Sequence, residues 1–147
     1  MTSQAQGEIV SIHICVGHRR PMESVESANA IAQFGLEGDG HATSDPGRSA
    51  RQVLLMDRET LDRLGLAPGD IRENITTSGV DLSSLVPGRK VSLGQTMVVE
   101  ITGECEPCGR MDEIRPGLRT ELDGQRGMLA RVLDGGTVAV GDTVRVS

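Results

Sequence analysis

Residues 86–102 of this 147-residue chain are VPGRKVSLGQTMVVEIT, and this stretch decides the fold class. Pro87-Gly88 and Gly94-Gln95 are turn sequences, and each precedes a short run that contains Val or Ile. The two runs, Lys90 to Leu93 and Met97 to Thr102, are too short for stable helices and predict two strands joined by a tight turn. This part of the chain is therefore expected to be β-structure.

The C-terminal quarter repeats the same pattern. Three short alternating runs, Met128 to Leu133, Thr137 to Val140 and Thr143 to Val146, are separated by glycine turns at Gly135-Gly136 and Gly141-Asp142. Many short strands with glycine-centred turns predict a mainly β protein with a few short helices. We expect it to form a closed or nearly closed β-barrel.

The N-terminal half contains weaker signals. Glu8 to Val16 alternates apolar and polar residues with a period of two, which predicts a half-buried strand. Ser27 to Phe34 fits either a helical turn or a second strand. Gly35 to Ser49 is rich in glycine and polar residues, and it predicts a long non-repetitive loop.

The clearest helix spans Asp57 to Leu64, with Asp57 as its N-cap and Gly65 as the residue after its end. Shorter elements are expected around it: a buried strand over Arg51 to Met56, a strand over Asn74 to Ser78, and a single turn from Asp81 to Leu85.

Composition limits what the protein can bind. The chain is the size of one domain, and its core must be aliphatic because Phe34 is the only aromatic residue. Stacking platforms for bases or sugars need aromatic surfaces, and the net charge of −6 disfavours a phosphate backbone as partner. We therefore expect no nucleic-acid partner. The chain also has no glycine motif or cysteine cluster that would predict a nicotinamide, flavin or iron–sulfur group.

The sequence also predicts a cellular location. Met1 to Glu8 is polar and does not resemble a signal peptide, and no apolar run approaches the ~20 residues that span a bilayer. We expect a cytoplasmic protein with no membrane partner, in which thiols stay reduced. Three cysteines are also an awkward number for a disulfide framework.

Cys105 and Cys108 have the spacing of a redox dithiol or of half a zinc site. A thioredoxin-like dithiol belongs at a helix start after the first strand of a βαβ unit, whereas this pair follows a late strand. A zinc site needs a second pair of ligands, and the remaining candidates, His13, Cys15, His18 and His41, form no second close pair. We expect no zinc.

Cys108 is the best candidate for chemistry. A lone cysteine is more often a small buried hydrophobe, by about two to one. Cys108, however, lies in a loop bounded by Pro107 and Gly109, which offers little core to fill. Arg110 is close enough in sequence to favour the thiolate, the form that acts as nucleophile and metal ligand.

Two further motifs combine glycine, acid, base and amide groups. In Gly38-Asp39-Gly40-His41, the glycines permit close approach to a ligand, although Asp39 and His41 are equally suited to bonding the loop backbone. In Arg72-Glu73-Asn74, an extended backbone would place Arg72 and Asn74 on one side, where they could bind an anion and a heterocycle edge. The alternative is an exposed ion pair involving Glu73.

Taken in order, these motifs resemble the MOSC domain, which is named for the C-terminal part of molybdenum-cofactor sulfurases. The resemblance covers about Gly7 to Val146, so residues 1–147 are expected to form one domain. It rests on six segments: Gly35 to His41, Arg51-Gln52-Val53, Arg72-Glu73-Asn74-Ile75, Gly79-Val80-Asp81-Leu82, Thr102-Gly103 ahead of Pro107-Cys108, and Gly141-Asp142.

The resemblance implies a β-barrel and a site around Cys108. In amidoxime-reducing members of the family, the matching cysteine binds molybdenum, and a segment similar to residues 72–75 holds the pterin of the molybdenum cofactor. It therefore implies Cys108 as catalytic residue and metal ligand. The implied cofactor-binding residues are Arg72, Asn74, Ser78, Asp39, His41 and Thr102.

The implied activity of this stand-alone bacterial type of MOSC protein is reduction of N-hydroxylated small molecules, with electrons from a separate donor. A second reading is a metal-free sulfur carrier that holds a persulfide on Cys108, supplied by a sulfur-donor protein, with Cys105 as resolving thiol. A third is a non-catalytic ligand-binding domain in which Cys108 is simply buried.

Overall fold

The computed structural model describes residues 5–17 and 20–146, so His18 lies outside the described residues. Seven strands close into a mixed barrel, in which β5 and β6 are parallel and the other neighbours are antiparallel. Around the barrel the order is β1 (Ala5–Ile14), β11 (Thr143–Val146), β7 (Lys90–Leu93), β8 (Met97–Glu104), β9 (Met128–Asp134), β5 (Val53–Asp57) and β6 (Ile75–Ser78). The mainly β barrel predicted from the sequence is confirmed.

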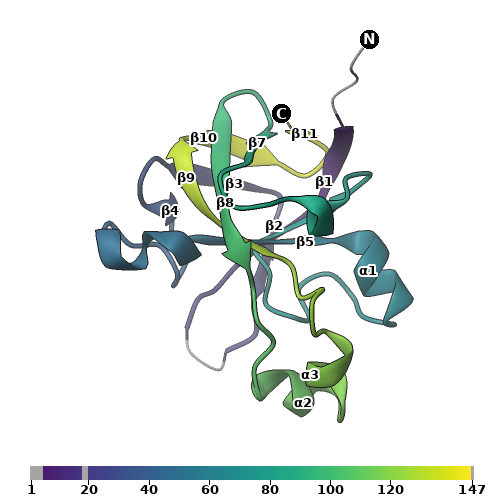
Figure 1. Cartoon of the computed structure of the whole chain (residues 1–147). Helices are drawn as coiled ribbons and strands as arrows, with labels where there is room; N and C mark the ends of the chain where they lie inside the picture. The colour runs from purple at the N-terminus through teal and green to yellow at the C-terminus, as the bar shows by residue number, and fades with distance from the viewer. Residues whose placement is uncertain (1–4, 18–19, 147) are drawn as a thin grey trace.

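The remaining elements surround this barrel (Figure 1). Strand β2 (Glu23–Val25) extends the sheet beside the end of β1, and β10 (Gly136–Ala139), β3 (Ser27–Ile31) and β4 (Gly35–Leu36) form a second small sheet. Figure 1 shows helices α2 and α3 side by side beyond one end of the barrel. The helical elements are η1 (Pro46–Arg51), α1 (Arg58–Arg63), η2 (Leu82–Ser84), α2 (Arg110–Ile114) and α3 (Leu118–Glu121).

Several details differ from the sequence prediction. In the ambiguous segment 27–34, residues 27–31 form the strand β3 and residues 32–34 form a turn, and the expected loop over 35–49 contains β4 and most of η1. Strand β1 ends at Ile14, and Val16 beyond it is 43% exposed. Helices α2 and α3 were not expected, because four or five residues are too few to show a helical period.

The core has two parts. Inward-facing aliphatic side chains from every barrel strand fill the barrel itself. A smaller cluster packs α1, α2 and α3 against the outside of β5, and its buried members are Met56, Leu61, Leu66, Ile71, Met111, Leu118 and Leu122. Because Met111 is 1% exposed and belongs to α2, this second cluster fixes α2 and the loop that precedes it.

None of the helices in the described part of the chain is both long and apolar enough to cross a membrane.

Strand β1 closes the barrel by changing partners along its length. It pairs with β11 through residues 5–8, with β6 through residues 8–12, and with β2 through residues 12–14. Gly7 lies where the partner changes, and a Cβ atom added there would overlap the carbonyl oxygen of Ser78. Glycine is required at this point because the two backbones approach too closely for a side chain.

We therefore expect Gly7→Ala to lower the free energy of unfolding by about 2 kcal/mol, the usual scale of overpacking in a well-packed site. Gly103→Ala is the matched control, because a Cβ atom at Gly103 has no heavy atom within 4 Å. Urea unfolding followed by circular dichroism measures both variants. Equal stability of the two would contradict the role of Gly7.

Candidate functional site

A cavity of about 190 Å³ lies where the β8–α2 segment faces the barrel, and we call it the Cys108 pocket. It is built from segments that are far apart in the sequence. The residues around it are His41, Arg51, Leu54, Arg72, Asn74, Cys105, Glu106, Cys108, Arg110, Met111, Arg126 and Leu129. Four predicted site residues, His41, Arg72, Asn74 and Cys108, therefore meet at one cavity.

Cys108 is the exposed thiol of the three free cysteines. It lies between β8 and α2, in a segment that contains Pro107 and Gly109 and is neither helix nor strand. The amide of Met111 donates a hydrogen bond to the Cys108 carbonyl at 3.0 Å. Because Met111 is anchored in the core, the backbone of Cys108 is held in place while its thiol stays accessible.

The pocket is strongly cationic. Four arginines line it, Arg51, Arg72, Arg110 and Arg126, against the single acidic residue Glu106. Such a cluster raises the local potential and attracts anions even though the whole chain has a net charge of −6. The wall therefore suits a thiolate, a phosphate or another small anion.

Arg72 is held in an unusual backbone conformation. Its φ of 68° is in the left-handed region, so the expected extended geometry of residues 72–74 is wrong. The turn directs its guanidinium to the carbonyls of Arg20 at 2.7 Å and Gly17 at 3.4 Å, and to the Cys15 sulfur at 3.3 Å. These contacts fix the side chain at the pocket wall.

Arg126, unlike Arg72, is buried, and its guanidinium contacts groups inside the protein. It is 7% exposed, and its Nη1 lies 2.8 Å from the sulfur of Cys105. Its other nitrogens contact the Ile71 carbonyl at 2.9 Å and the Met111 sulfur at 3.2 Å. A buried cation needs polar partners, and here a thiol provides one of them.

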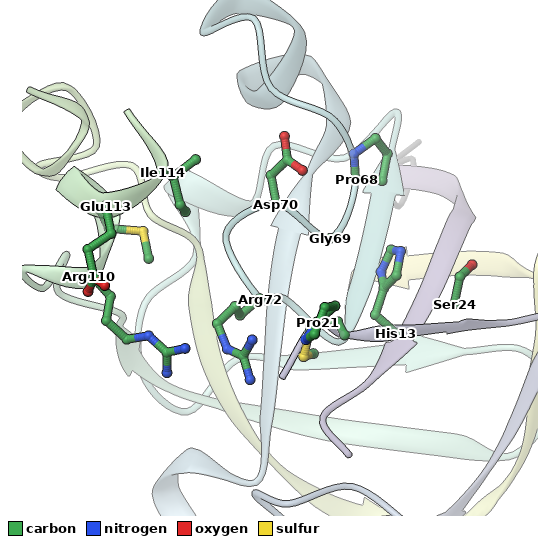
Figure 2. Close-up of a pocket in the computed structure, with 12 residues that line it drawn as sticks. His13, Pro21, Ser24, Pro68, Gly69, Asp70, Arg72, Arg110, Glu113 and Ile114 are labelled. Atoms are coloured by element: carbon green, nitrogen blue, oxygen red, sulfur yellow. The ribbon is translucent and has the colours of Figure 1, made fainter. Parts of the chain in front are cut away.

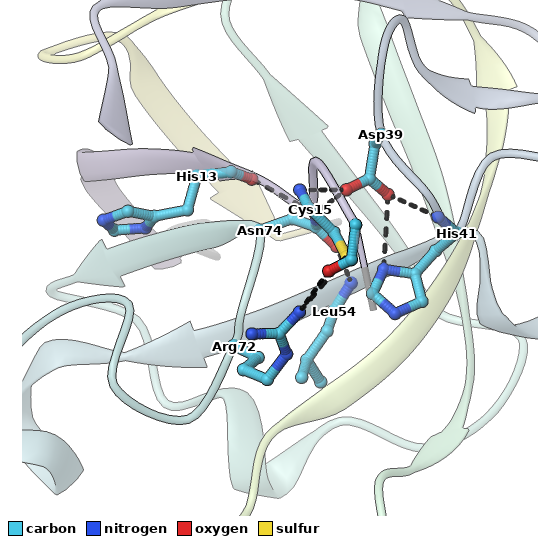
Figure 3. A network of polar contacts seen from close by, with 8 residues as sticks. His13, Cys15, Asp39, His41, Leu54, Arg72 and Asn74 are labelled. Atoms are coloured by element: carbon cyan, nitrogen blue, oxygen red, sulfur yellow. Dashed lines mark hydrogen bonds and ion pairs between the residues drawn. The ribbon is translucent and has the colours of Figure 1, made fainter. Parts of the chain in front are cut away.

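Figure 3 shows the network beneath the pocket, centred on the buried carboxylate of Asp39. One carboxylate oxygen accepts hydrogen bonds from the Cys15 amide at 2.8 Å and the Asn74 side chain at 3.0 Å. The other accepts the His41 amide at 3.1 Å and lies 3.3 Å from His41 Nδ1. Asp39 thus bonds the loop backbone, as its motif suggested, and also orients the His41 ring.

The polar atoms of the Asn74 side chain form their hydrogen bonds with other groups of the protein. Its Nδ2 donates to Asp39 and to the His13 carbonyl at 3.2 Å, and its Oδ1 accepts the Leu54 amide at 3.0 Å. Both N–H donors are occupied, which leaves little capacity to read a heterocycle edge. The exposed ion pair considered for Glu73 is wrong, because Glu73 is fully buried and accepts from Gly69 and Thr76.

Three predicted site residues do not line the pocket: Asp39 lies behind His41 and Asn74, and Ser78 and Thr102 lie elsewhere. Ser78 lies at the far end of β6 from Asn74, where it pairs with Glu8. The Thr102 hydroxyl donates to the carbonyl of Ala50. Sequence reasoning considered Cys15 only as a zinc ligand within the predicted strand Glu8 to Val16, and it missed the contact of Cys15 with Arg72.

A second cavity of about 490 Å³ adjoins the first, since Arg72, Arg110 and Met111 line both. Figure 2 shows Arg110 on one side of it, His13 and Ser24 on the other, and Arg72 between them. Burial lowers the pKa of His13, and the opposing attraction of Glu73 and Asp70 is smaller. The two cavities share Arg72 and Arg110, and the second cavity is also lined by His13 and by the acidic residues Asp70 and Glu113.

The comparisons agree with this architecture. The MOSC domain model matches residues 41–145, which is more than half of the chain, so the protein belongs to the MOSC domain family. Among curated proteins, none matches the sequence.

Three crystal structures have the same fold at low sequence identity. The YuaD protein from Bacillus subtilis has a TM-score of 0.83 and 19% identity, over 99% of this chain and 98% of that one. YiiM from Geobacillus stearothermophilus has a TM-score of 0.75 and 18% identity, over 96% and 75% of the two chains. YiiM from Escherichia coli has a TM-score of 0.68 and 19% identity, over 95% and 69%.

The lowered pKa of His13 predicts a pH dependence of stability. The unfolded chain binds a proton near the ordinary histidine pKa of about 6.5, whereas the folded protein binds it only at lower pH. Stability should therefore fall as the pH drops through and below this value. In urea unfolding at pH 7.5 and 5.5, we expect His13→Gln to lose less stability than the wild type, and an equal loss would refute the assignment.

Proposed function

We propose that this MOSC protein binds a molybdenum–pterin cofactor through Cys108 and reduces N-hydroxylated small molecules. The observation that carries the proposal is an exposed cysteine in a pocket lined by four arginines. A thiolate is a soft ligand suited to a transition metal, and guanidinium groups bind phosphate in a planar, bidentate manner. The pocket provides both kinds of group for a sulfur-bound metal with an anionic organic part.

The donor set fits such a cofactor better than a metal ion alone. Within the described residues, no group of three or more His, Cys, Asp or Glu side chains could hold a metal ion. The protein therefore offers one thiolate, and the pterin dithiolene would supply further sulfur ligands and make two-electron chemistry available. The 190 Å³ pocket is smaller than the usual small-molecule site of about 300–1,000 Å³, but the adjoining 490 Å³ cavity provides the missing room.

Within this proposal, each residue has a role that its contacts permit. Arg72 and Arg110 line both cavities, so they would hold the anionic parts of the cofactor. Asn74 and Asp39 would not bind the cofactor directly, because their polar atoms already bond to the protein. They would instead hold the pocket wall in place. Cys108 would bind the metal.

The proposed cellular location and electron source follow from the same chemistry. We propose the cytoplasm as location, where a reducing environment keeps Cys108 as a free thiol. Electrons would come from a separate donor protein, since the proposed cofactor needs two electrons for each substrate molecule.

The alternative function is sulfur transfer through a Cys108 persulfide, and the observation that favours it is Cys105. This second thiol lines the same pocket, three residues away, with Arg126 Nη1 at 2.8 Å. The Cys105 thiolate could attack the inner sulfur of the Cys108 persulfide, which would form a Cys105–Cys108 disulfide and release the outer sulfur as hydrosulfide. The third reading required a buried Cys108 and is wrong in that form, because the Cys108 thiol is exposed.

Metal analysis tests the proposal. Protein purified from a host that makes the cofactor should contain close to one molybdenum atom per chain, measured by mass spectrometry of the metal. In Cys108→Ser, the metal content should fall at least tenfold, because a hydroxyl is a hard and weakly ionised ligand. Cys105→Ser is the matched control and should keep its molybdenum.

The loaded protein should also reduce an N-hydroxylated base with reduced methyl viologen as electron source. Metal-free protein with a sulfur mass adduct on Cys108 would reject the proposal in favour of sulfur transfer. Loss of molybdenum in both cysteine variants would also count against Cys108 as the ligand.

A further inference from the structure

The proposed reduction consumes protons as well as electrons. The N–O bond of R–NH–OH breaks, two electrons come from the donor protein, and two protons complete R–NH₂ and water. The four arginines of the Cys108 pocket cannot supply protons, because guanidinium does not deprotonate in proteins. The protons must therefore come from water or from another acid at the pocket.

His41 is placed for this task by a buried carboxylate. Its Nδ1 lies 3.3 Å from Asp39 Oδ2, its own backbone amide bonds the same oxygen at 3.1 Å, and the Asp39 side chain is fully buried. Asp39 cannot swing away, because its other oxygen accepts the Cys15 amide and the Asn74 side chain. The carboxylate therefore fixes both the position of the ring and the nitrogen that faces it.

The direction of the ring decides which nitrogen exchanges protons. The contact between Nδ1 and the Asp39 carboxylate favours a proton on Nδ1, which leaves Nε2 as the nitrogen that faces away from the carboxylate and is available to exchange a proton. Figure 3 shows Nε2 on the opposite side of the ring from Asp39, and His41 lines the Cys108 pocket. The His41 side chain is 46% exposed, which gives it a path for reprotonation from water.

We propose that His41 is the proton-transfer residue of the Cys108 pocket, with Asp39 as the positioning residue that holds Nε2 toward the reacting atoms. This step rests on the proposed function. Nε2–H of the charged imidazole gives its proton to the leaving hydroxyl oxygen as the N–O bond breaks, and water leaves. The neutral ring then takes a proton from solvent, and the second proton, which completes R–NH₂ on the nitrogen, also comes from solvent.

The other histidine near the site is less suited to this role. His13 lines the adjoining cavity, but it is 5% exposed and burial lowers its pKa, so it rarely carries a proton to give. Around His41, the charged groups of the pocket are the guanidiniums of Arg51, Arg72, Arg110 and Arg126 and the carboxylates of Asp39 and Glu106. Of the two carboxylates, Asp39 is committed to positioning.

The first test measures turnover of the molybdenum-loaded protein with an N-hydroxylated base and reduced methyl viologen. We expect His41→Ala to lower kcat by about 10²- to 10⁴-fold, the usual contribution of general acid catalysis, while molybdenum content stays unchanged. Added imidazole should restore at least tenfold of the lost rate, because it can fill the space and transfer the proton. A purely structural role would not give this rescue.

The second test needs neither metal nor substrate. In ¹⁵N NMR spectra of the metal-free protein, neutral His41 should carry its proton on Nδ1, and Asp39→Asn should abolish this preference. Asp45→Asn is the matched control. Asp45 lies in the same segment between β4 and η1 and caps η1, so this substitution should leave the His41 tautomer unchanged.

The outcomes separate the two proposals. An active wild type whose His41→Ala variant is equally active, or is not rescued by imidazole, overturns the role of His41 and leaves the proposed function intact. An Nε2–H tautomer in the wild type overturns the positioning role of Asp39. A molybdenum-loaded wild type that does not reduce the substrate overturns the proposed function, and this step with it.

Discussion

The side-chain amide of Asn74 is the contact on which both the barrel and the pocket depend. It bonds the end of β1 through the His13 carbonyl, the start of β5 through the Leu54 amide, and the segment between β4 and η1 through Asp39. Its backbone adds two bonds, to His13 at 2.7 Å and Leu54 at 2.9 Å. A fully buried amide left without these partners would cost several kcal/mol, roughly 1–3 for each lost group. The strands next to the pocket therefore keep one relative position.

The β-structure could be predicted because its signals are local. Glycine turns separate β7 from β8, β9 from β10 and β10 from β11, and Asp57 caps α1 through the Thr60 amide, as expected from its position. Helices α2 and α3 could not be predicted, since their stability comes from burying Met111 and Leu118 against α1 and β5 rather than from a periodic pattern.

The site was only partly predictable for a related reason. Arg72 and Asn74 meet at the pocket, but through a left-handed turn at Arg72 that no local signal reveals. The positive character of the pocket was equally hidden, because Arg51 and Arg126 are far apart in the sequence and only the fold brings them to the same cavity. Net charge averages over the surface, whereas a binding site depends on which charges the fold brings together.

The backbone of Arg72 also shows where the chain has given up stability. A left-handed conformation at a residue with a Cβ atom costs roughly 1–2 kcal/mol, and glycine would adopt it freely. Glycine has no guanidinium, however, and could not contact Cys15 or line both cavities. Position 72 is thus a point at which the most stable sequence and the most useful one differ. Selection for thermal stability alone would be expected to replace Arg72 by glycine, and the pocket would then lose this guanidinium.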